Sequence, residues 1–347
     1  YKEIKMKAAV FLGKETIETR ELETPSLKEG EILIKVMACG ICGTDVHIYH
    51  GSPGATEATV PVVLGHEFSG EVVECAPGTS RIKVGDKVTV DPNMYCGNCD
   101  YCLNGKKNYC SSMSAIGVNQ NGGFEAYCAV PEKQAILLSP DVDYEEAAMA
   151  EPVACCLRGI DNIGITQGDT VCIIGGGAIG QIMAQLARIS GASKVVVSEP
   201  VEMRRDLAIS LGADAAIDPM AGDLKEQLQS AIGKDYTDVV IECVGIPVAV
   251  GQAVHIAGKG SKILLFSVPN PTATFELPLI DIFQKELTIK GSFVNPDTQY
   301  RAASLISEKR LNLKPLITHR YPAEQLEEAI KKQMANDSVK VVVLPQS

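Results

Sequence analysis

A glycine-rich turn between an apolar strand and an amphipathic helix is the feature that most constrains the fold of this chain. The turn is Gly175-x-Gly177-x-x-Gly180, and it follows the apolar run 171–174. Further strands are predicted at 194–198, 238–242 and 261–266, with helical segments between them. Alternation of strands and helices indicates an α/β fold with a doubly wound parallel sheet.

The turn has the context of a dinucleotide-binding loop. Its first glycine permits the tight turn, the second lets the backbone approach a pyrophosphate, and the third allows helix and strand to pack closely. The helix that follows is predicted to bury one face. That face consists of Ile179, Ile182, Met183, Leu186 and Ile189.

Glu199 lies nineteen residues beyond the last glycine, at a predicted strand end. A carboxylate there accepts hydrogen bonds from both ribose hydroxyls and repels a 2′-phosphate, so the sequence favours NAD over NADP. Arg204 and Arg205 follow closely in the sequence. They could accommodate a 2′-phosphate, or they could belong to a solvated helix face. The expected cofactor contacts are Gly175, Gly177, Ile179, Gly180, Glu199 and Arg204.

Four cysteines lie within fifteen residues, as Cys96-x2-Cys99-x2-Cys102-x7-Cys110. Four thiolates on one short loop suit a closed tetrahedral zinc site, which leaves no position for a substrate and is therefore structural. The alternatives are a disulfide-bonded or incidental cluster and a zinc ribbon that binds nucleic acid. A ribbon would bring basic residues, but only Lys106 and Lys107 are near.

A second candidate metal site has mixed ligands: Cys42, His66 and Glu67. A thiolate, an imidazole and a carboxylate are typical of a zinc site that keeps one position open. Each residue alone would more simply be structural. The stretch 42–47 adds Asp45, which could orient a metal-bound imidazole, and it adds Thr44 and His47, which could pass a proton to solvent.

Composition excludes several other classes of protein. The net charge is -11, from 32 basic and 43 acidic residues, which argues against a nucleic-acid or anionic membrane surface. No apolar run approaches the ~18 residues of a membrane span, and the apolar run 7–13 is too short for a secretory signal. We therefore expect a cytoplasmic protein. Met6 is a candidate native start, with residues 1–5 as a remnant ahead of it.

The chain is predicted to form two domains. Short strands broken by Gly and Pro, such as 31–36 and 70–74, indicate a β-barrel domain over 1–153 that contains the cysteine lobe at about 91–113. Residues 154–293 form the dinucleotide-binding domain. A helix near 299–308 and a strand at 340–344 are expected to return to the first domain, over 294–347.

These residues together resemble the zinc-dependent medium-chain dehydrogenases, and within them the polyol dehydrogenases typified by sorbitol dehydrogenase. The resemblance covers nearly the whole chain. It rests on the motifs already described together with 40–41, Gly65 and the stretch 314–320. It implies a GroES-like catalytic domain, a Rossmann domain that binds NAD, and two zinc ions per chain.

The resemblance also assigns roles. Cys42, His66 and Glu67 would hold the catalytic zinc, and Glu151 stands where the polyol branch has a glutamate that binds zinc or its water. The resemblance implies that the two carboxylates exchange places on the metal during turnover, so both belong to the expected ligand set. The implied reaction releases a proton from a secondary alcohol through Thr44 and His47 and passes its hydride to nicotinamide, giving a ketone.

Substrate identity stays open between polyols and threonine. Val294-Asn295 stands where sorbitol dehydrogenases carry Arg-Tyr, which disfavours sorbitol itself, and no cationic clamp for a phosphorylated polyol is evident. L-Threonine 3-dehydrogenases share the pattern at 42–49. A non-catalytic relative should have lost metal ligands, which are all present here. The resemblance further implies a homo-oligomer, a dimer or a tetramer, formed through the Rossmann edges.

Overall fold

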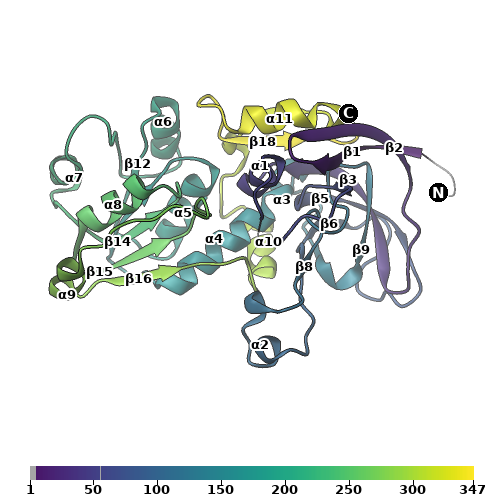
Figure 1. The fold of residues 1–347 in the computed structure, drawn as a ribbon, viewed down its shortest axis with the longest axis horizontal. Helices are drawn as coiled ribbons and strands as arrows, with labels where there is room; N and C mark the ends of the chain where they lie inside the picture. The colour runs from purple at the N-terminus through teal and green to yellow at the C-terminus, as the bar shows by residue number, and fades with distance from the viewer. Residues whose placement is uncertain (1–4, 55) are drawn as a thin grey trace. The chain divides into compact units, whose positions relative to one another are not determined.

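The computed structural model describes residues 5–54 and 56–347 of the chain (Figure 1). Residues 1–4, most of the expected remnant ahead of Met6, lie outside the described part. Contacts divide the chain into two compact units. Unit 1 comprises Tyr1–Ala154 and Val294–Ser347, and unit 2 comprises Cys155–Phe293. The domain boundaries predicted from the sequence were 153/154 and 293/294.

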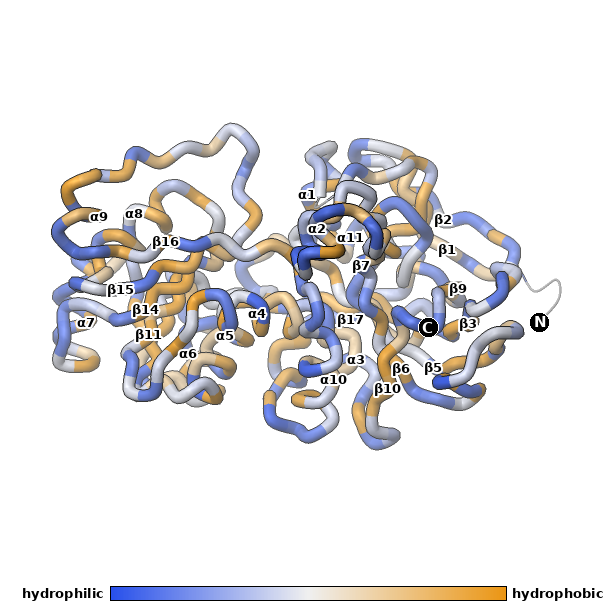
Figure 2. The backbone as a smooth tube through the Cα atoms, turned by 90° about the horizontal axis from the view of Figure 1, so that it is seen from below, coloured by the Kyte–Doolittle hydropathy of each residue, from blue (hydrophilic) through white to orange (hydrophobic). Residues whose placement is uncertain are grey.

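Unit 2 is built on a six-stranded, all-parallel sheet in the order β13-β12-β11-β14-β15-β16. Its strands are β11 Thr170–Ile174, β12 Lys194–Ser198, β13 Ala215–Ile217, β14 Thr237–Glu242, β15 Ala257–Leu265 and β16 Thr288–Gly291. Hydrophobic residues concentrate in β11, β14 and β15 (Figure 2). Their side chains are buried because helices pack against the sheet, as a parallel sheet requires. The predicted doubly wound sheet is therefore confirmed.

The helices of unit 2 connect successive strands. They are the end of α4 Ala150–Ile163, then α5 Ala178–Ile189, α6 Glu202–Ser210, α7 Leu224–Ile232, α8 Pro247–Ile256 and α9 Leu279–Lys285. The prediction for α5 was partly wrong. Ile182, Met183 and Leu186 are buried as expected, but Ile179 in the first turn is only half-buried and Ile189 at the helix end is exposed, and two glutamines of α5 are buried instead.

Unit 1 is a β-barrel-like body made of two larger sheets. One sheet has the order β2-β1-β4, and the other has the order β10-β6-β5-β3-β18-β17 with β9 also paired to β3. The strands are β1 Lys5–Gly13, β2 Thr16–Glu23, β3 Glu31–Gly40, β4 Val62–Val63, β5 Glu67–Cys75, β6 Lys87–Val90, β9 Tyr127–Pro131, β10 Ala135–Leu137, β17 Ile317–Tyr321 and β18 Lys340–Val343.

The C-terminal segment returns to unit 1, as the sequence predicts. Strand β18 pairs antiparallel with β3, joining Val342 to Gly40 and Val343 to Cys39. This pairing brings the last strand beside the end of β3, where α1 Gly43–Tyr49 begins. The remaining helices of unit 1 are α2 Asp100–Leu103, α3 Tyr144–Ala148, α10 Gln299–Ser307 and α11 Leu326–Gln333, with short 3₁₀ turns at Lys107–Tyr109, Glu132–Gln134, Lys314–Leu316 and Ala323–Gln325.

The four-cysteine lobe projects from the barrel of unit 1 (Figure 1). Its chain runs from β7 Asn93–Met94 to β8 Ser114–Ala115, and the antiparallel pairing of these two strands closes its base. Among the described residues, no helix has the length and apolar character that crossing a bilayer requires.

Candidate metal and cofactor sites

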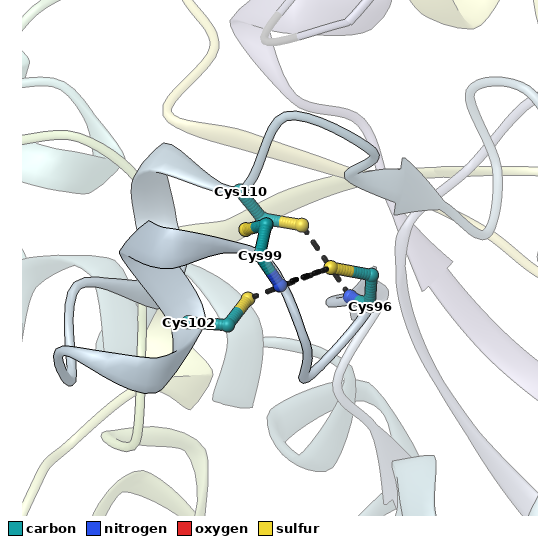
Figure 3. A group of neighbouring side chains, drawn as sticks. All are labelled: Cys96, Cys99, Cys102 and Cys110. Carbon is teal, nitrogen blue, oxygen red and sulfur yellow. Dashed lines mark hydrogen bonds between the residues drawn. The ribbon is translucent and has the colours of Figure 1, made fainter.

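The four cysteines of the lobe converge on one point (Figure 3). Their sulfur atoms all lie within 4.8 Å of one another. Cys96 follows β7, Cys99 precedes α2, Cys102 lies in α2, and Cys110 follows a 3₁₀ turn. The loop can wrap so tightly because Gly97 and Gly105 adopt left-handed backbone conformations, with φ of 74° and 71°.

Backbone N–H groups surround these sulfur atoms. Cys96 N–H donates to Cys110 Sγ at 3.3 Å, and Cys99 N–H donates to Cys96 Sγ at 3.4 Å. Donors from Cys102 and Ser111 lower the pKa of the Cys99 thiol to about 6. All four thiols are free rather than disulfide-bonded. Four converging sulfur atoms with backbone donors around them match a closed zinc site.

The second cluster is assembled at the ends of two paired strands. Cys42 follows β3, His66 precedes β5, and Glu67 opens β5 opposite Gly40. One ligand atom from each of Cys42, His66 and Glu67 lies within 4.8 Å of the others. His66 and Glu67 are buried, and Cys42 is partly exposed. Three different donors thus converge on a point with access from one side.

Asp45 orients this cluster. Its Oδ2 accepts the Cys42 N–H at 2.9 Å, and its Oδ1 faces His66 Nδ1 at 3.4 Å. Neither Asp45 Oδ1 nor His66 Nδ1 has a closer hydrogen-bond partner in the described chain, and both are buried. The contact leaves Nε2 of His66 as the ligand atom of the ring.

The local charges favour a cation at this point. Burial by itself lowers the pKa of His66, but Asp45 and Cys42 together raise it well above its ordinary value. The same negative groups that favour a proton on the imidazole favour a divalent metal beside it. The donor set, the buried polar atoms left without partners and this charge therefore fit a zinc ion held by Cys42, His66 and Glu67.

Lys340 is a member of this site that the sequence analysis missed. Its Nζ forms a buried ion pair with Glu67 Oε2 and donates to Ile41 O at 2.9 Å. Gly40 makes room for this pair, because a Cβ there would overlap Glu67 Oε2 and lie 2.8 Å from Lys340 Cε. The only hint in the sequence was a lysine at the start of an apolar strand.

Thr44, His47 and Glu151 occupy different positions around the cluster. Thr44 and His47 lie three residues apart on α1, so they share a helix face, and both are half-buried. Glu151 is buried in the first turn of α4. It does not belong to the three-residue group whose ligand atoms converge.

The Val294-Asn295 pair is also explained by the structure. Asn295 is completely buried, where its Oδ1 accepts Asn93 Nδ2–H at 2.6 Å and its Nδ2 donates to Gln299 at 3.0 Å. Val294 has a left-handed backbone with φ of 49°. Asn295 thus belongs to a buried polar network of unit 1.

The glycine turn of unit 2 has the geometry expected of a phosphate-binding loop. Gly175 has a φ of 98°, which only glycine adopts without strain. A Cβ at Gly180 would collide with Gly175 O, whereas a Cβ at Gly177 would meet nothing within 4 Å. The turn is therefore closed on its inner side and open at Gly177, next to the first turn of α5, where Ile179 lies half-buried.

Glu199 follows β12 directly and is held in place by backbone donors. Its Oε2 accepts Gly176 N–H at 2.7 Å, and its Oε1 accepts Val201 N–H at 2.9 Å. Each oxygen keeps a further lone pair for a ribose hydroxyl. The two neighbouring arginines differ. Arg204 lies 3.9 Å from Glu199 Oε1, whereas Arg205 donates to Glu199 O and Pro200 O.

Family models match both units of the chain. The alcohol dehydrogenase GroES-like domain matches residues 28–141, and the zinc-binding dehydrogenase model matches residues 178–308. A sorbitol dehydrogenase of Halalkalibacterium halodurans is 34% identical over 332 residues, which are 94% of this chain and 95% of that protein. An L-threonine 3-dehydrogenase of Pyrococcus horikoshii is 34% identical over 330 residues, 93% and 94% of the two chains.

A solved structure is similar throughout. A protein of Sinorhizobium meliloti 1021, described as a zinc-binding dehydrogenase and bound to NADP, superposes with a TM-score of 0.94. It is 39% identical, and the match covers 99% of this chain and 100% of that one. The similarity therefore extends over both units, including the cysteine lobe and the glycine turn.

Proposed function

Because the chain belongs to the zinc-dependent alcohol and polyol dehydrogenase family, we propose that it oxidises a secondary alcohol of a polyol to a ketone with NAD. The observation that carries the proposal is the buried convergence of Cys42, His66 and Glu67, oriented by Asp45. These three residues would hold the catalytic zinc, with Glu151 as a further candidate ligand. The four cysteines of the lobe would hold a second, structural zinc.

Zinc supplies a Lewis acid that lowers the pKa of the alcohol, and NAD supplies the hydride acceptor. The residues of the chain handle the proton. Thr44 Oγ1 accepts a hydrogen bond from the substrate hydroxyl, and His47, on the same face of α1, takes the released proton toward solvent. The carbinol carbon loses a hydride and the hydroxyl loses a proton, so the product is a ketone.

Unit 2 would bind NAD. The open side of the glycine turn at Gly177 and the first turn of α5 supply backbone N–H groups for the pyrophosphate. Glu199 supplies a fixed carboxylate for the ribose hydroxyls, which supports NAD over NADP. Because the similar Sinorhizobium structure is bound to NADP, the affinities of this protein for both dinucleotides should be measured.

L-Threonine 3-dehydrogenase activity is the second candidate. A threonine dehydrogenase and a sorbitol dehydrogenase share the same sequence identity with this chain, 34%. Burial of Asn295 in a polar network, at the place where sorbitol dehydrogenases carry a substrate-binding pair, also separates this chain from sorbitol dehydrogenase itself. A non-catalytic relative is disfavoured by the complete set of candidate ligands.

A substrate panel tests the proposal. The zinc-loaded protein is incubated with NAD and with polyols, polyol phosphates, simple secondary alcohols or L-threonine, while reduced cofactor is followed by absorbance. Turnover of polyols supports the proposal. Turnover of threonine alone would replace the polyol assignment, and no turnover with two zinc ions bound would favour the non-catalytic relative.

A homo-oligomer and a cytoplasmic location complete the proposal. Strand β16 is an edge of the parallel sheet, and α9, which packs against the neighbouring strand β15, exposes Leu279, Ile280 and Phe283 to 81%, 58% and 79%. An open strand edge and an exposed apolar helix in the same unit favour pairing with a second copy. Twelve free cysteines suit a reducing compartment. A monomeric mass by light scattering would refute the oligomer.

A further inference from the structure

Gln181 is a completely buried amide directly after the last glycine of the dinucleotide turn. Its Nε2 donates two hydrogen bonds, to Gly176 O at 2.9 Å and to Arg204 O at 2.9 Å. Both partners are backbone carbonyls, which only accept, so the orientation of the amide is fixed by its partners. One side chain therefore ties the glycine turn to the first turn of α6.

The two tied segments are the ones that present groups to the Glu199 carboxylate. Gly176 N–H donates to Glu199 Oε2 at 2.7 Å, and the guanidinium of Arg204 lies 3.9 Å from Oε1. The packing at Gly176 is tight, since a Cβ there would lie 2.9 Å from Glu199 Cγ. A shift of the glycine turn or of the first turn of α6 would change whether the Glu199 carboxylate or the Arg204 guanidinium faces a bound ribose.

The oxygen of the Gln181 amide is unfavourable for stability. Gln181 Oε1 is buried without a hydrogen-bond partner in the described chain. An unpaired buried acceptor costs about 1–3 kcal/mol, which an apolar side chain of similar length would avoid. One turn further along the same helix face lies Gln185, a second buried glutamine. What Gln181 adds at its position is its pair of N–H donors.

We propose that Gln181 is a positioning residue for cofactor selectivity. Its amide holds the first turn of α6 against the glycine turn, so that the Glu199 carboxylate, and not the Arg204 guanidinium, meets the 2′ position of the adenosine ribose. This inference rests on the proposed NAD-dependent function. Without the tie, α6 is free to shift, and Arg204 can approach a 2′-phosphate.

The test is Gln181→Met, which keeps the length of the side chain and removes both donors. Binding of NADH and of NADPH to the full-length, zinc-loaded protein is measured by fluorescence titration. The wild type is expected to prefer NADH. In Gln181→Met, the ratio of the NADPH to the NADH dissociation constant falls about tenfold, the effect of losing two hydrogen bonds.

Gln185→Met is the matched control, because Gln185 is a second buried glutamine of α5, one turn beyond Gln181, and its Nε2 donates to Gln181 O at 3.5 Å. In Gln185→Met, the ratio of the NADPH to the NADH dissociation constant should stay within about twofold of the wild-type ratio. Adding Arg204→Met to Gln181→Met should abolish the gain in NADPH affinity, which a merely structural role of Gln181 would not predict. If Gln181→Met fails to fold, Gln181→Leu replaces it.

The outcomes separate the two proposals. A wild type that binds neither dinucleotide refutes the proposed function. A wild type that prefers NADPH, or a folded Gln181 variant with the wild-type ratio, refutes the role of Gln181 and leaves the dehydrogenase proposal standing. A gain in NADPH affinity that survives loss of Arg204 also refutes it.

Discussion

The two candidate metal sites of unit 1 differ both in ligand chemistry and in construction. The cysteine lobe takes all its ligands from residues 96–110, on a projecting loop with Cys96 exposed. The second site draws Cys42, His66 and Glu67 from the ends of two strands, and it adds Lys340 from the last strand of the chain. The first site is formed by one local loop, whereas the second site is formed by strands that are distant in the sequence.

This difference in construction implies a difference in role. Four thiolates saturate a tetrahedral ion, so a zinc ion in the lobe would contribute stability. A mixed thiolate, imidazole and carboxylate set leaves a position open, and the buried charged neighbours Asp45 and Lys340 would tune a bound metal rather than ligate it. Loss of a ligand at one site should therefore affect folding, and loss of a ligand at the other should affect turnover.

The largest effect is expected from Cys42→Ser. A Lewis acid contributes several kcal/mol to the reaction barrier, so kcat/KM should fall about 10⁴-fold with the preferred substrate of the panel. Zinc content should fall from two ions to one per chain, and the unfolding free energy should change little. Cys75→Ser, at a cysteine outside both clusters, is the control. Two retained zinc ions with full activity would remove Cys42 from the site.

Cys99→Ser should produce the converse pattern. The lobe loses its metal, and the unfolding free energy should fall by about 4 kcal/mol, which is typical of a lost structural metal. Zinc content should again fall to one ion per chain. Protein that remains folded at low temperature should keep most of its kcat. A variant that is as stable as the wild type but inactive would reverse the roles assigned to the two sites.

The lobe and the sheet of unit 2 were predictable because their information is local. Cysteine spacing defines the lobe, and β12 begins and ends where the sequence predicted, at Lys194 and Ser198, around an apolar run of three valines. Strand ends were less accurate elsewhere, and β3 continues to Gly40 beyond its predicted end at 36, because it pairs with β5 and β18. Pairing of distant strands is set by tertiary contacts rather than by the local pattern.

Long-range partners are the part of the sites that the sequence could not supply. Lys340 meets Glu67 only because β18 pairs with β3, and no spacing in the sequence indicates that contact. Gln181 was missed for a different reason. Its helix was predicted from apolar periodicity, and that method assigns polar residues to the exposed face.

The buried ion pair offers a smaller test of the second site. Gly40→Ala would push a methyl group into Glu67 Oε2 and to within 2.8 Å of Lys340 Cε. Because this displaces a carboxylate ligand and its neighbour, zinc affinity should fall about 10–100-fold, measured by competition with a chelator. Gly43→Ala is the matched control, since a Cβ there meets nothing within 4 Å. Equal affinities in both variants would exclude a role for the pair in metal binding.

The smallest effect concerns Asp91, at the base of the lobe. It lies partly buried between β6 and β7, and it accepts hydrogen bonds from Asn93 N at 3.1 Å and Asn295 Nδ2 at 3.4 Å. Burial raises its pKa to about 6, with Asp297 and Lys107 as the charged groups that face it. The folded protein therefore holds this proton more tightly than the unfolded chain, whose aspartates titrate near pH 3.9.

Stability from this proton is complete below about pH 4 and is lost as the pH rises through about 6. Between pH 5 and pH 7 the wild type should lose about 1 kcal/mol from this group, measured by urea denaturation. Asp91→Asn keeps an acceptor oxygen and cannot ionise, so its stability relative to the wild type should rise by that amount over the same range. Asp141→Asn is the control, because the pKa of Asp141, about 2, lies outside the window. If the unfolding free energies of Asp91→Asn and of the wild type change with pH in parallel, Asp91 does not titrate in this range. The base of the lobe then contains no titrating group, unlike the second site with its buried charges.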